Sequence, residues 1–183
     1  MNNPVLQAIA DRRSIRGYAA ERITEEQLRT LLTAAQQAPS ARNSQPWHFS
    51  VVQDKAILDE FARDYVALAG GDPAKAEVRD GYNLFFRAPT VIFISTPVEA
   101  PTRYSQIDCG IAAQTIALAA HSIGLGTVIL GRPMDVFLSP KGPAYEKAFK
   151  FPEGHKFAIA VAVGRPTLSK DAHPIREGLV SRI

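Results

Sequence analysis

Two polar segments of the sequence carry side chains suited to holding a small anionic molecule. Residues 11–18 read DRRSIRGY, with three arginines and one serine within five residues. Guanidinium groups match phosphate oxygens bidentately, and a serine hydroxyl adds a directional donor. Residues 38–49 read APSARNSQPWHF, and their two prolines restrict a loop of hydroxyl, amide and backbone groups. Together the two segments indicate a phosphorylated cofactor.

The basic segment also has a second interpretation, as a solvated turn that binds nothing. Taken alone, a run of arginines is more often a solvated surface than a ligand site. The segments further along the chain favour the phosphate site.

The elements that position these segments are indicated by the hydrophobic pattern. A first helix is expected to begin at Pro4, and a second at Thr24, where a T-x-x-Q capping box precedes an apolar face. Pro39 ends the second helix. A strand over 47–53 follows, and Asp54 then caps a helix that carries Phe61.

The second half of the chain is expected to supply the centre of a sheet. After a break at 70–73 comes a stretch interpreted as helical up to Phe86. Residues 89–95 form a continuous apolar run typical of a central strand. An apolar helix over 106–121 ends at Gly124, and further strands are expected over 127–130 and 157–163.

The pattern predicts one α+β domain over residues 1–183, in which helices surround a mixed sheet of about four to five strands. The helix over 106–121 is apolar on almost every side, so it should be buried on every side. In a chain of this length, a subunit interface is a natural way to bury it.

Composition excludes several classes of function. The net charge is +3 and the basic residues form no long stripe, which argues against a nucleic-acid partner. The single cysteine, Cys109, allows no intrachain disulfide and suits a reducing compartment. The apolar stretch 111–123 is too short to span a bilayer, and the first residues lack signal-peptide features. We therefore expect a soluble, cytoplasmic protein with no membrane partner.

The ordered set RRSIRGY, APSARNSQPWHF and the run from Asp108 to Gly131 resembles the flavin-dependent nitroreductase family. The resemblance extends from Arg12 to about residue 164. It implies a bound FMN, NADH or NADPH as electron donor, and a homodimer with the flavin at the subunit interface.

The resemblance also implies roles for individual residues near the phosphate. Arg12, Arg13 and Ser14 match the family's contacts to the flavin phosphate and ribityl chain, and Arg16 matches less closely. Arg176 matches a basic residue that often completes the phosphate site. Arg165, after the last expected strand, is a rival for that role.

Other matches concern the flavin ring and the loop that reaches it from the second subunit. The loop residues are Pro39, Ser40, Ala41 and Asn43, and Ala41 would offer only its backbone or a van der Waals contact. Asn83 could pair with the pyrimidine edge, although a structural role fits it equally well. The run Ile129, Leu130, Gly131 would pass beside the isoalloxazine, where a Gly131 N–H would stabilise charge on the reduced ring.

The remaining reactive residue types are better explained structurally. Trp47 and His48 are expected beside the core, His121 at a helix end, and Cys109 as a buried thiol. The sequence shows no Cys/His cluster with metal-ligand spacing and no G-x-S-x-G nucleophile motif. We therefore expect no metal and assign no catalytic side chain.

The sequence thus predicts an FMN-dependent oxidoreductase with two half-reactions. NADH or NADPH would give hydride to the flavin, and a nitroaromatic, quinone or similar electron-poor acceptor would then be reduced in the same space. The same scaffold could instead serve dehydrogenation, reductive dehalogenation or free-flavin reduction. Two further alternatives are a flavin-binding protein without turnover and a module that binds another anion or a phosphorylated partner.

Overall fold

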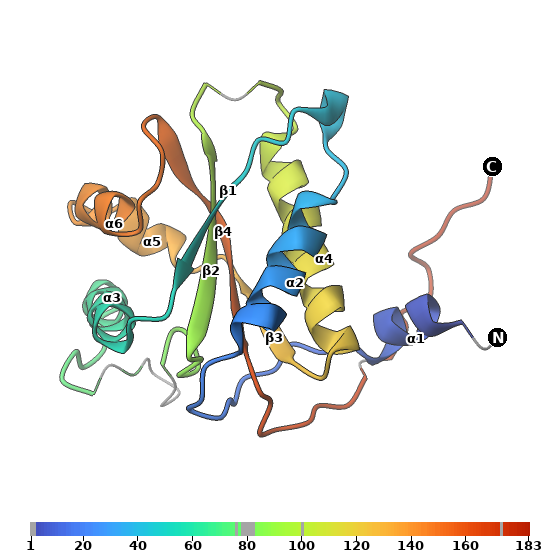
Figure 1. Cartoon of the computed structure of the whole chain (residues 1–183), viewed down its shortest axis with the longest axis horizontal. Coiled ribbons are helices and arrows are strands. Elements are labelled where there is room, and N and C mark those ends of the chain that lie inside the picture. The colour runs from blue at the N-terminus through green and yellow to red at the C-terminus, as the bar shows by residue number, and fades with distance from the viewer. Residues whose placement is uncertain (1–2, 76, 78–82, 100, 173) are drawn as a thin grey trace.

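A four-stranded antiparallel sheet forms the centre of the protein, with helices on both faces (Figure 1). The structure is a computed structural model that describes residues 3–75, 77, 83–99, 101–172 and 174–183. The strand order is β1 (His48–Val52), β2 (Thr90–Pro97), β4 (His155–Gly164) and β3 (Gly126–Leu130). This architecture confirms the predicted α+β fold with a sheet of about four to five strands, but the sheet is not mixed as expected, because every pair of neighbouring named strands is antiparallel.

The register of the sheet aligns the strands along most of their length. His48 of β1 lies opposite Ser95 of β2, and Thr90 of β2 lies opposite Val163 of β4. A bulge between Ile94 and Ser95 interrupts the pairing of β2 with β4. β2 and β4 occupy the two inner positions, which agrees with the near-continuous apolar character of both strands.

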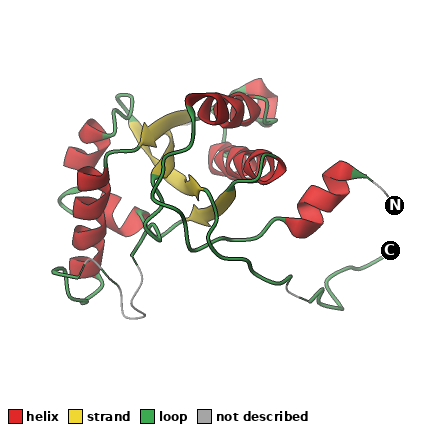
Figure 2. Cartoon of the chain, turned by 60° about the horizontal axis from the view of Figure 1, so that its bottom comes forward, coloured by secondary structure: helices red, strands yellow, loops and turns green. Residues whose placement is uncertain are grey.

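The helices divide between the two faces of the sheet (Figures 1 and 2). One face packs against α2 (Glu25–Gln36) and α4 (Ser105–Ser122), and the other packs against α3 (Lys55–Leu68), α5 (Met134–Phe137) and α6 (Gly142–Ala148). The loop after α2 contains a short 3₁₀ helix, η1 (Ala41–Asn43), and α1 (Pro4–Asp11) precedes the sheet.

Local sequence signals set the helix ends. Thr24 and Gln27 form the reciprocal capping box at the start of α2. The Asp54 carboxylate accepts hydrogen bonds from two backbone N–H groups at the start of α3. Gly124 follows α4 with a φ of 77°, a conformation that glycine adopts without strain. These three predicted boundaries are confirmed.

The face of the sheet beneath α3, α5 and α6 is filled with aromatic rings. Phe61 of α3 lies with its ring centroid 4.6 Å from Tyr145 and 5.9 Å from Phe93. Phe93 in turn lies 4.5 Å from Phe149. Such tilted and edge-to-face pairs add to the burial of apolar area.

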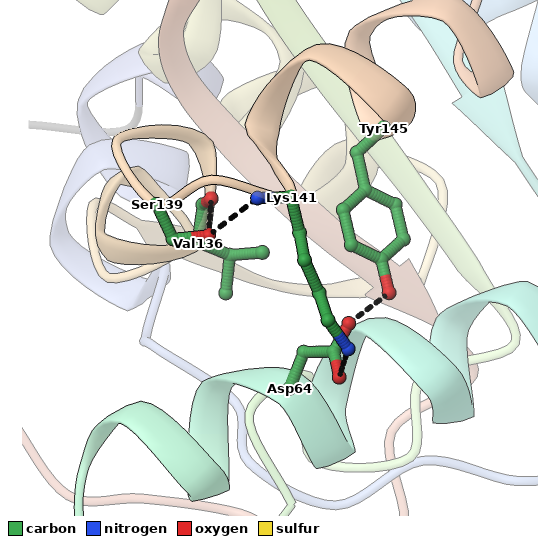
Figure 3. Close-up of polar contacts among 5 residues, drawn as sticks. All are labelled: Asp64, Val136, Ser139, Lys141 and Tyr145. Carbon is green, nitrogen blue, oxygen red and sulfur yellow. Dashed lines mark hydrogen bonds and ion pairs between the residues drawn. The ribbon is translucent and has the colours of Figure 1, made fainter.

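A polar contact joins α3 to α6 above this core (Figure 3). Asp64 of α3 accepts a hydrogen bond from the Tyr145 hydroxyl at 2.7 Å and pairs with the Lys141 ammonium at 2.6 Å. Ser139 steadies the turn before α6, because its hydroxyl donates to the Val136 carbonyl and accepts from the Lys141 N–H. Burial, together with Asp64, raises the pKa of Tyr145, so its hydroxyl stays a donor.

Helix α4 is not buried on every side by its own chain. Ile107 is 61% exposed, and Ile111, Gln114 and Leu118 follow it at helical spacing and are only half-buried. None of the eight residues of α1, all of them described, is buried. Helix α1 and the C-terminal tail both lie away from the sheet in Figures 1 and 2. The expected burial of α4 therefore needs a surface that the described residues of this chain do not supply.

Two expectations for the secondary structure were wrong or incomplete. Residues 83–86 form a turn rather than the end of a helix, while 76 and 78–82 lie outside the described residues. The short helices α5 and α6 were not predicted. Within the described part of the chain, no helix is long and apolar enough to cross a membrane.

Candidate functional site

The arginine cluster, residues 12–16, follows the end of α1. It lies beside the start of β3, the strand that comes after α4. Arg12 is the C-cap of α1, and the chain then extends so that the Ile15 N–H donates to the Thr127 carbonyl at 2.8 Å. Ser14 forms a parallel bridge with Thr127. This pairing with the start of β3 fixes the backbone of the cluster at the end of α4.

The arginines of this cluster retain unused donors. The Nε atoms of Arg12 and Arg13 are buried, and neither has a hydrogen-bond partner within the described residues. One terminal nitrogen of Arg13 donates to the Arg12 carbonyl at 2.8 Å, which curls the side chain back toward α1. Buried donors without acceptors are uncommon in native proteins, so they indicate a missing acceptor group. An anion such as a phosphate would supply one.

A groove runs beside the cluster along the end of β3. It has a volume of about 220 Å³, and its lining comes from three parts of the chain: Arg16; Tyr65, Leu84 and Phe86; and residues 128–132. The Arg16 guanidinium lies 5.6 Å from the centre of the Phe86 ring. The predicted run Ile129, Leu130 and Gly131 therefore lies along the same groove as Arg16. The groove is smaller than most ligand pockets, which suits half of a site.

Gly131 leaves one wall of this groove open. Apart from its two chain neighbours, a Cβ atom built at Gly131 would meet no atom of the described residues within 4 Å. The next residue, Arg132, lines the groove and donates to the Tyr65 hydroxyl at 3.3 Å. The groove therefore has an open backbone segment flanked by two guanidinium groups, those of Arg16 and Arg132.

The polar loop lies at the opposite end of α4. Ser40, Ala41 and Asn43 lie in or next to η1, where the Ala41 N–H donates to the Asp108 carboxylate of α4 at 3.1 Å. Pro39 and Asn43 are exposed, whereas Ser40 and Ala41 are half-buried. A depression of about 390 Å³ beside the loop is lined by Ala41, Arg42 and residues 101–104.

The structure does not bring the two segments together within one chain. The arginine cluster lies beside Thr127, after the C-terminal end of α4, and the loop is tied to Asp108 near its N-terminal end. From Asp108 to Ser122 the helix rises roughly 20 Å at 1.5 Å per residue. A ligand shorter than this separation that contacts both segments would therefore receive them from two different chains.

Asn83 lies apart from the groove. It lines a separate cavity of about 670 Å³ with Tyr18, Arg22 and Arg63, and its side-chain oxygen accepts from the Phe85 N–H at 2.9 Å. This contact supports the structural interpretation of Asn83. The predicted flavin contact of Asn83 has no support from this placement.

The two rival arginines near the C-terminus also lie outside the cluster. Arg165 is exposed, and its carbonyl accepts from the Ala19 N–H at 3.0 Å. Arg176 is exposed in the C-terminal tail. Among the described contacts, none links either side chain to Arg12, so the choice between them stays a prediction.

Sequence reasoning missed several residues that the structure places at these sites. Tyr65, Leu84, Phe86 and Arg132 line the groove, and Asp108 anchors the loop. Arg132 had a visible signal, since a cation directly follows Gly131. Asp108 gave only the weak signal of a carboxylate in the first turn of a helix.

The residues expected to be structural are found in structural positions. Cys109 is fully buried, and burial raises the pKa of its thiol to about 11. Trp47 is half-buried against the hydrophobic core between the sheet and helices α2 and α4. His48 is the first residue of β1. His121 lies in the last turn of α4.

Comparisons with known proteins identify the fold and the family. The sequence model of the nitroreductase family matches residues 9–165. The chain belongs to the nitroreductase family. A crystal structure of a nitroreductase with bound FMN from Desulfitobacterium hafniense superposes with a TM-score of 0.88 at 32% identity, covering 100% of both chains.

Two archaeal relatives of this nitroreductase-family chain are both named NADH dehydrogenase/NAD(P)H nitroreductase. The relative from Methanothermobacter thermautotrophicus is 39% identical over 130 residues, which make up 69% of this chain and 60% of the relative. The relative from Archaeoglobus fulgidus is 31% identical over 169 residues, or 91% of this chain and 87% of the relative.

Proposed function

We propose that this protein binds FMN at a site shared by two copies of the chain. There it would transfer electrons from NADH or NADPH to nitroaromatic, quinone or similar acceptors. The observation that carries the proposal is the pair of buried, unpartnered Nε donors on Arg12 and Arg13. The FMN bound to the Desulfitobacterium nitroreductase and the NAD(P)H in the names of the archaeal relatives support the choice of cofactor and donor.

The residues of the cluster and groove fit a phosphorylated flavin. Arg12, Arg13 and Ser14 would hold the phosphate, because they are adjacent at the end of α1 beside β3 and both arginines carry a buried Nε donor with no partner within the described residues. The open wall at Gly131 would let a planar ring approach the backbone closely. When bound, FMN would supply the hydride-accepting and hydride-donating centre, and the protein would supply its position and electrostatic surroundings.

A second copy of the chain would complete the site. A two-fold axis through the middle of α4 would carry the partner's 39–43 loop to the arginine cluster of the first chain. Three surfaces in this structure lack a covering: Ile107 on α4, the exposed Val5 and Leu6 of α1, and the apolar side chains of the tail. Exposed apolar surface of this extent favours an interface.

The experiment that tests this function is an anaerobic visible spectrum. FMN is added, excess is removed by gel filtration, and spectra are taken before and after NADPH and then NADH. Retained flavin bands that bleach with either nucleotide support the proposal and reveal the preferred donor. Retained bands that neither nucleotide bleaches would favour a flavoprotein with another donor or without turnover. No retained flavin would favour the binding of a different anion.

A further inference from the structure

Asp108 makes the contact that ties the polar loop to the rest of the molecule. We propose that Asp108 is a positioning residue, whose carboxylate fixes the 40–45 loop in its cofactor-binding conformation through the backbone N–H of Ala41. The two groups are 3.1 Å apart and 67 residues apart in sequence. The inference rests on the proposed function, because it assigns the residue that holds one half of that site.

The 40–45 loop has a conformation that needs support from outside. Arg42, Asn43 and Gln45 have φ values of 57°, 53° and 44°. The left-handed conformation is unfavourable for a non-glycine residue and persists only where its surroundings fix it. The bonds from the Gln45 N–H to Ser40 and from the Gln45 side chain to Asn43 are internal and move with the loop. Among the described hydrogen bonds, the one to Asp108 holds the loop to another element.

The burial of the Asp108 carboxylate is energetically unfavourable. Its side chain is 3% exposed, and Oδ2 has no hydrogen-bond partner within the described residues. A carboxylate buried with one hydrogen bond is costly, and the favourable field of the first turn of α4 offsets only part of that cost. A residue that only filled space here would be apolar. The carboxylate is therefore better explained by the bond that it accepts from Ala41.

The position of Asp108 also connects the loop to the helix expected to lie at the subunit contact. The preceding residue, Ile107, is exposed on the outer side of α4. Because the loop is bonded to α4, its position relative to that helix is fixed. The same anchor would therefore place the loop correctly against the partner's arginine cluster.

The first test uses the protein without FMN. Arg42 is exposed in the loop, and trypsin cleaves after it only when the loop opens. Asp108→Ala should speed this cleavage about tenfold, the effect of losing one charge-assisted hydrogen bond. Asp108→Asn keeps a carbonyl acceptor and should stay within about threefold of the wild type. Asp54→Ala is the matched control, because it removes a helix-capping carboxylate from α3 and should leave cleavage at Arg42 unchanged.

The second test measures the affinity for FMN and the visible spectrum of the bound flavin. Asp108→Ala should weaken FMN binding about tenfold and shift the spectrum, and Asp108→Asn should restore both. If the alanine variant does not fold, Ala41→Pro removes the N–H donor instead and should give the same loss. Ser40 already has an extended backbone, with φ −139° and ψ 152°, which suits a following proline.

Several outcomes would overturn the proposal. If Asp108→Ala is cleaved at the wild-type rate and binds FMN with wild-type affinity, the hydrogen bond to Ala41 does not hold the loop. Unchanged FMN affinity in Ala41→Pro would lead to the same conclusion. An Asp108→Asn variant as impaired as the alanine variant would exclude the acceptor role. If the wild type itself retains no FMN, the proposed function fails, and the trypsin experiment still decides whether Asp108 holds the loop.

Discussion

Arg12 is the residue on which we expect the phosphate site to depend most directly. Replacing it with alanine should weaken FMN binding by about 1.5–3 kcal/mol, the range for hydrogen bonds to a charged group. The physical reason is its buried Nε donor, which has no acceptor within the described chain. Fluorescence titration of FMN measures the effect.

The matched control for this substitution is Arg29→Ala on the exposed side of α2. It removes the same charge at a distance from the cluster, so its FMN affinity should match the wild type. A folded Arg12→Ala protein with unchanged affinity would remove Arg12 from the site.

Cys109 should be inert in the folded protein. Burial raises the pKa of its thiol to about 11, and the Asp108 carboxylate adds to the increase. At pH 8 the native protein should not react with an aromatic disulfide reagent, so no aromatic thiolate is released from the reagent. The protein unfolded in guanidinium should release one equivalent. The chain has a single cysteine, so the signal is unambiguous. Rapid labelling of the native state would contradict the buried placement.

Residue types in the sequence indicated the candidate donors more readily than the contacts that hold them in place. Three guanidinium groups and a serine near each other are visible without a structure. The role of Asp108 is not, because it depends on a contact across 67 residues. Tyr65 and Phe86 were missed for the same reason, since only the fold brings them to the groove.

At the scale of elements, the contact between α3 and α6 should stabilise the protein through Asp64. Asp64→Ala leaves the buried Tyr145 hydroxyl without an acceptor, so the free energy of unfolding should fall by about 1–3 kcal/mol. Asp59→Ala, also on α3, is the control. Its carboxylate pairs with the exposed Lys55, and the loss should be about 0.5 kcal/mol or less. Urea unfolding of both variants provides the comparison, and equal losses would contradict a special role for Asp64.

His155, the first residue of β4, should make the free energy of unfolding depend on pH. The ring lies 3.3 Å from the Ser95 hydroxyl and 6.3 Å, between centroids, from His48. Burial, aided by His48, lowers the pKa of His155 below the ordinary value of 6.5. Below pH 6.5 the unfolded chain therefore binds a proton that the folded chain resists, and stability falls as the pH drops.

Urea midpoints at pH 7.5 and 5.5 measure this contribution. His155→Gln should lose less stability on acidification than the wild type. His121→Gln, at the end of α4, is the control for loss of an imidazole. An identical pH dependence in His155→Gln and the wild type would rule out the contribution.

Elements with strong local signals were predicted well, and those without them were not. The capping box at Thr24 and the cap at Asp54 fixed two helix starts. Helices α5 and α6 have 4 and 7 residues, too few for a helical period to show. The stretch up to Phe86 was interpreted as helical, but its described end is a turn in which Leu84 and Phe85 are buried in the aromatic core.

At the scale of the whole molecule, the separation of the two polar segments bears on how the proposed site would be assembled. The sequence predicted both segments and the α+β sheet, yet it could not show that α4 holds the segments at opposite ends. That separation follows from packing, through the bridge at Thr127 and the anchor at Asp108. The proposed contact of one FMN with both segments therefore carries a geometric requirement, namely a site shared by two chains.

Subunit complementation tests this requirement directly. Arg12→Ala and Ala41→Pro should each bind FMN weakly, because each damages a different half of the site. Unfolded together and refolded as a mixture, they should form mixed dimers in which one of the two sites has an undamaged arginine cluster and an undamaged loop. With random two-fold assembly, about a quarter of all sites should regain wild-type affinity. A mixture of Arg12→Ala with Arg13→Ala damages the same half twice and should regain none. Equal behaviour of the two mixtures, with no recovery in either, would mean that each flavin site is built within one chain.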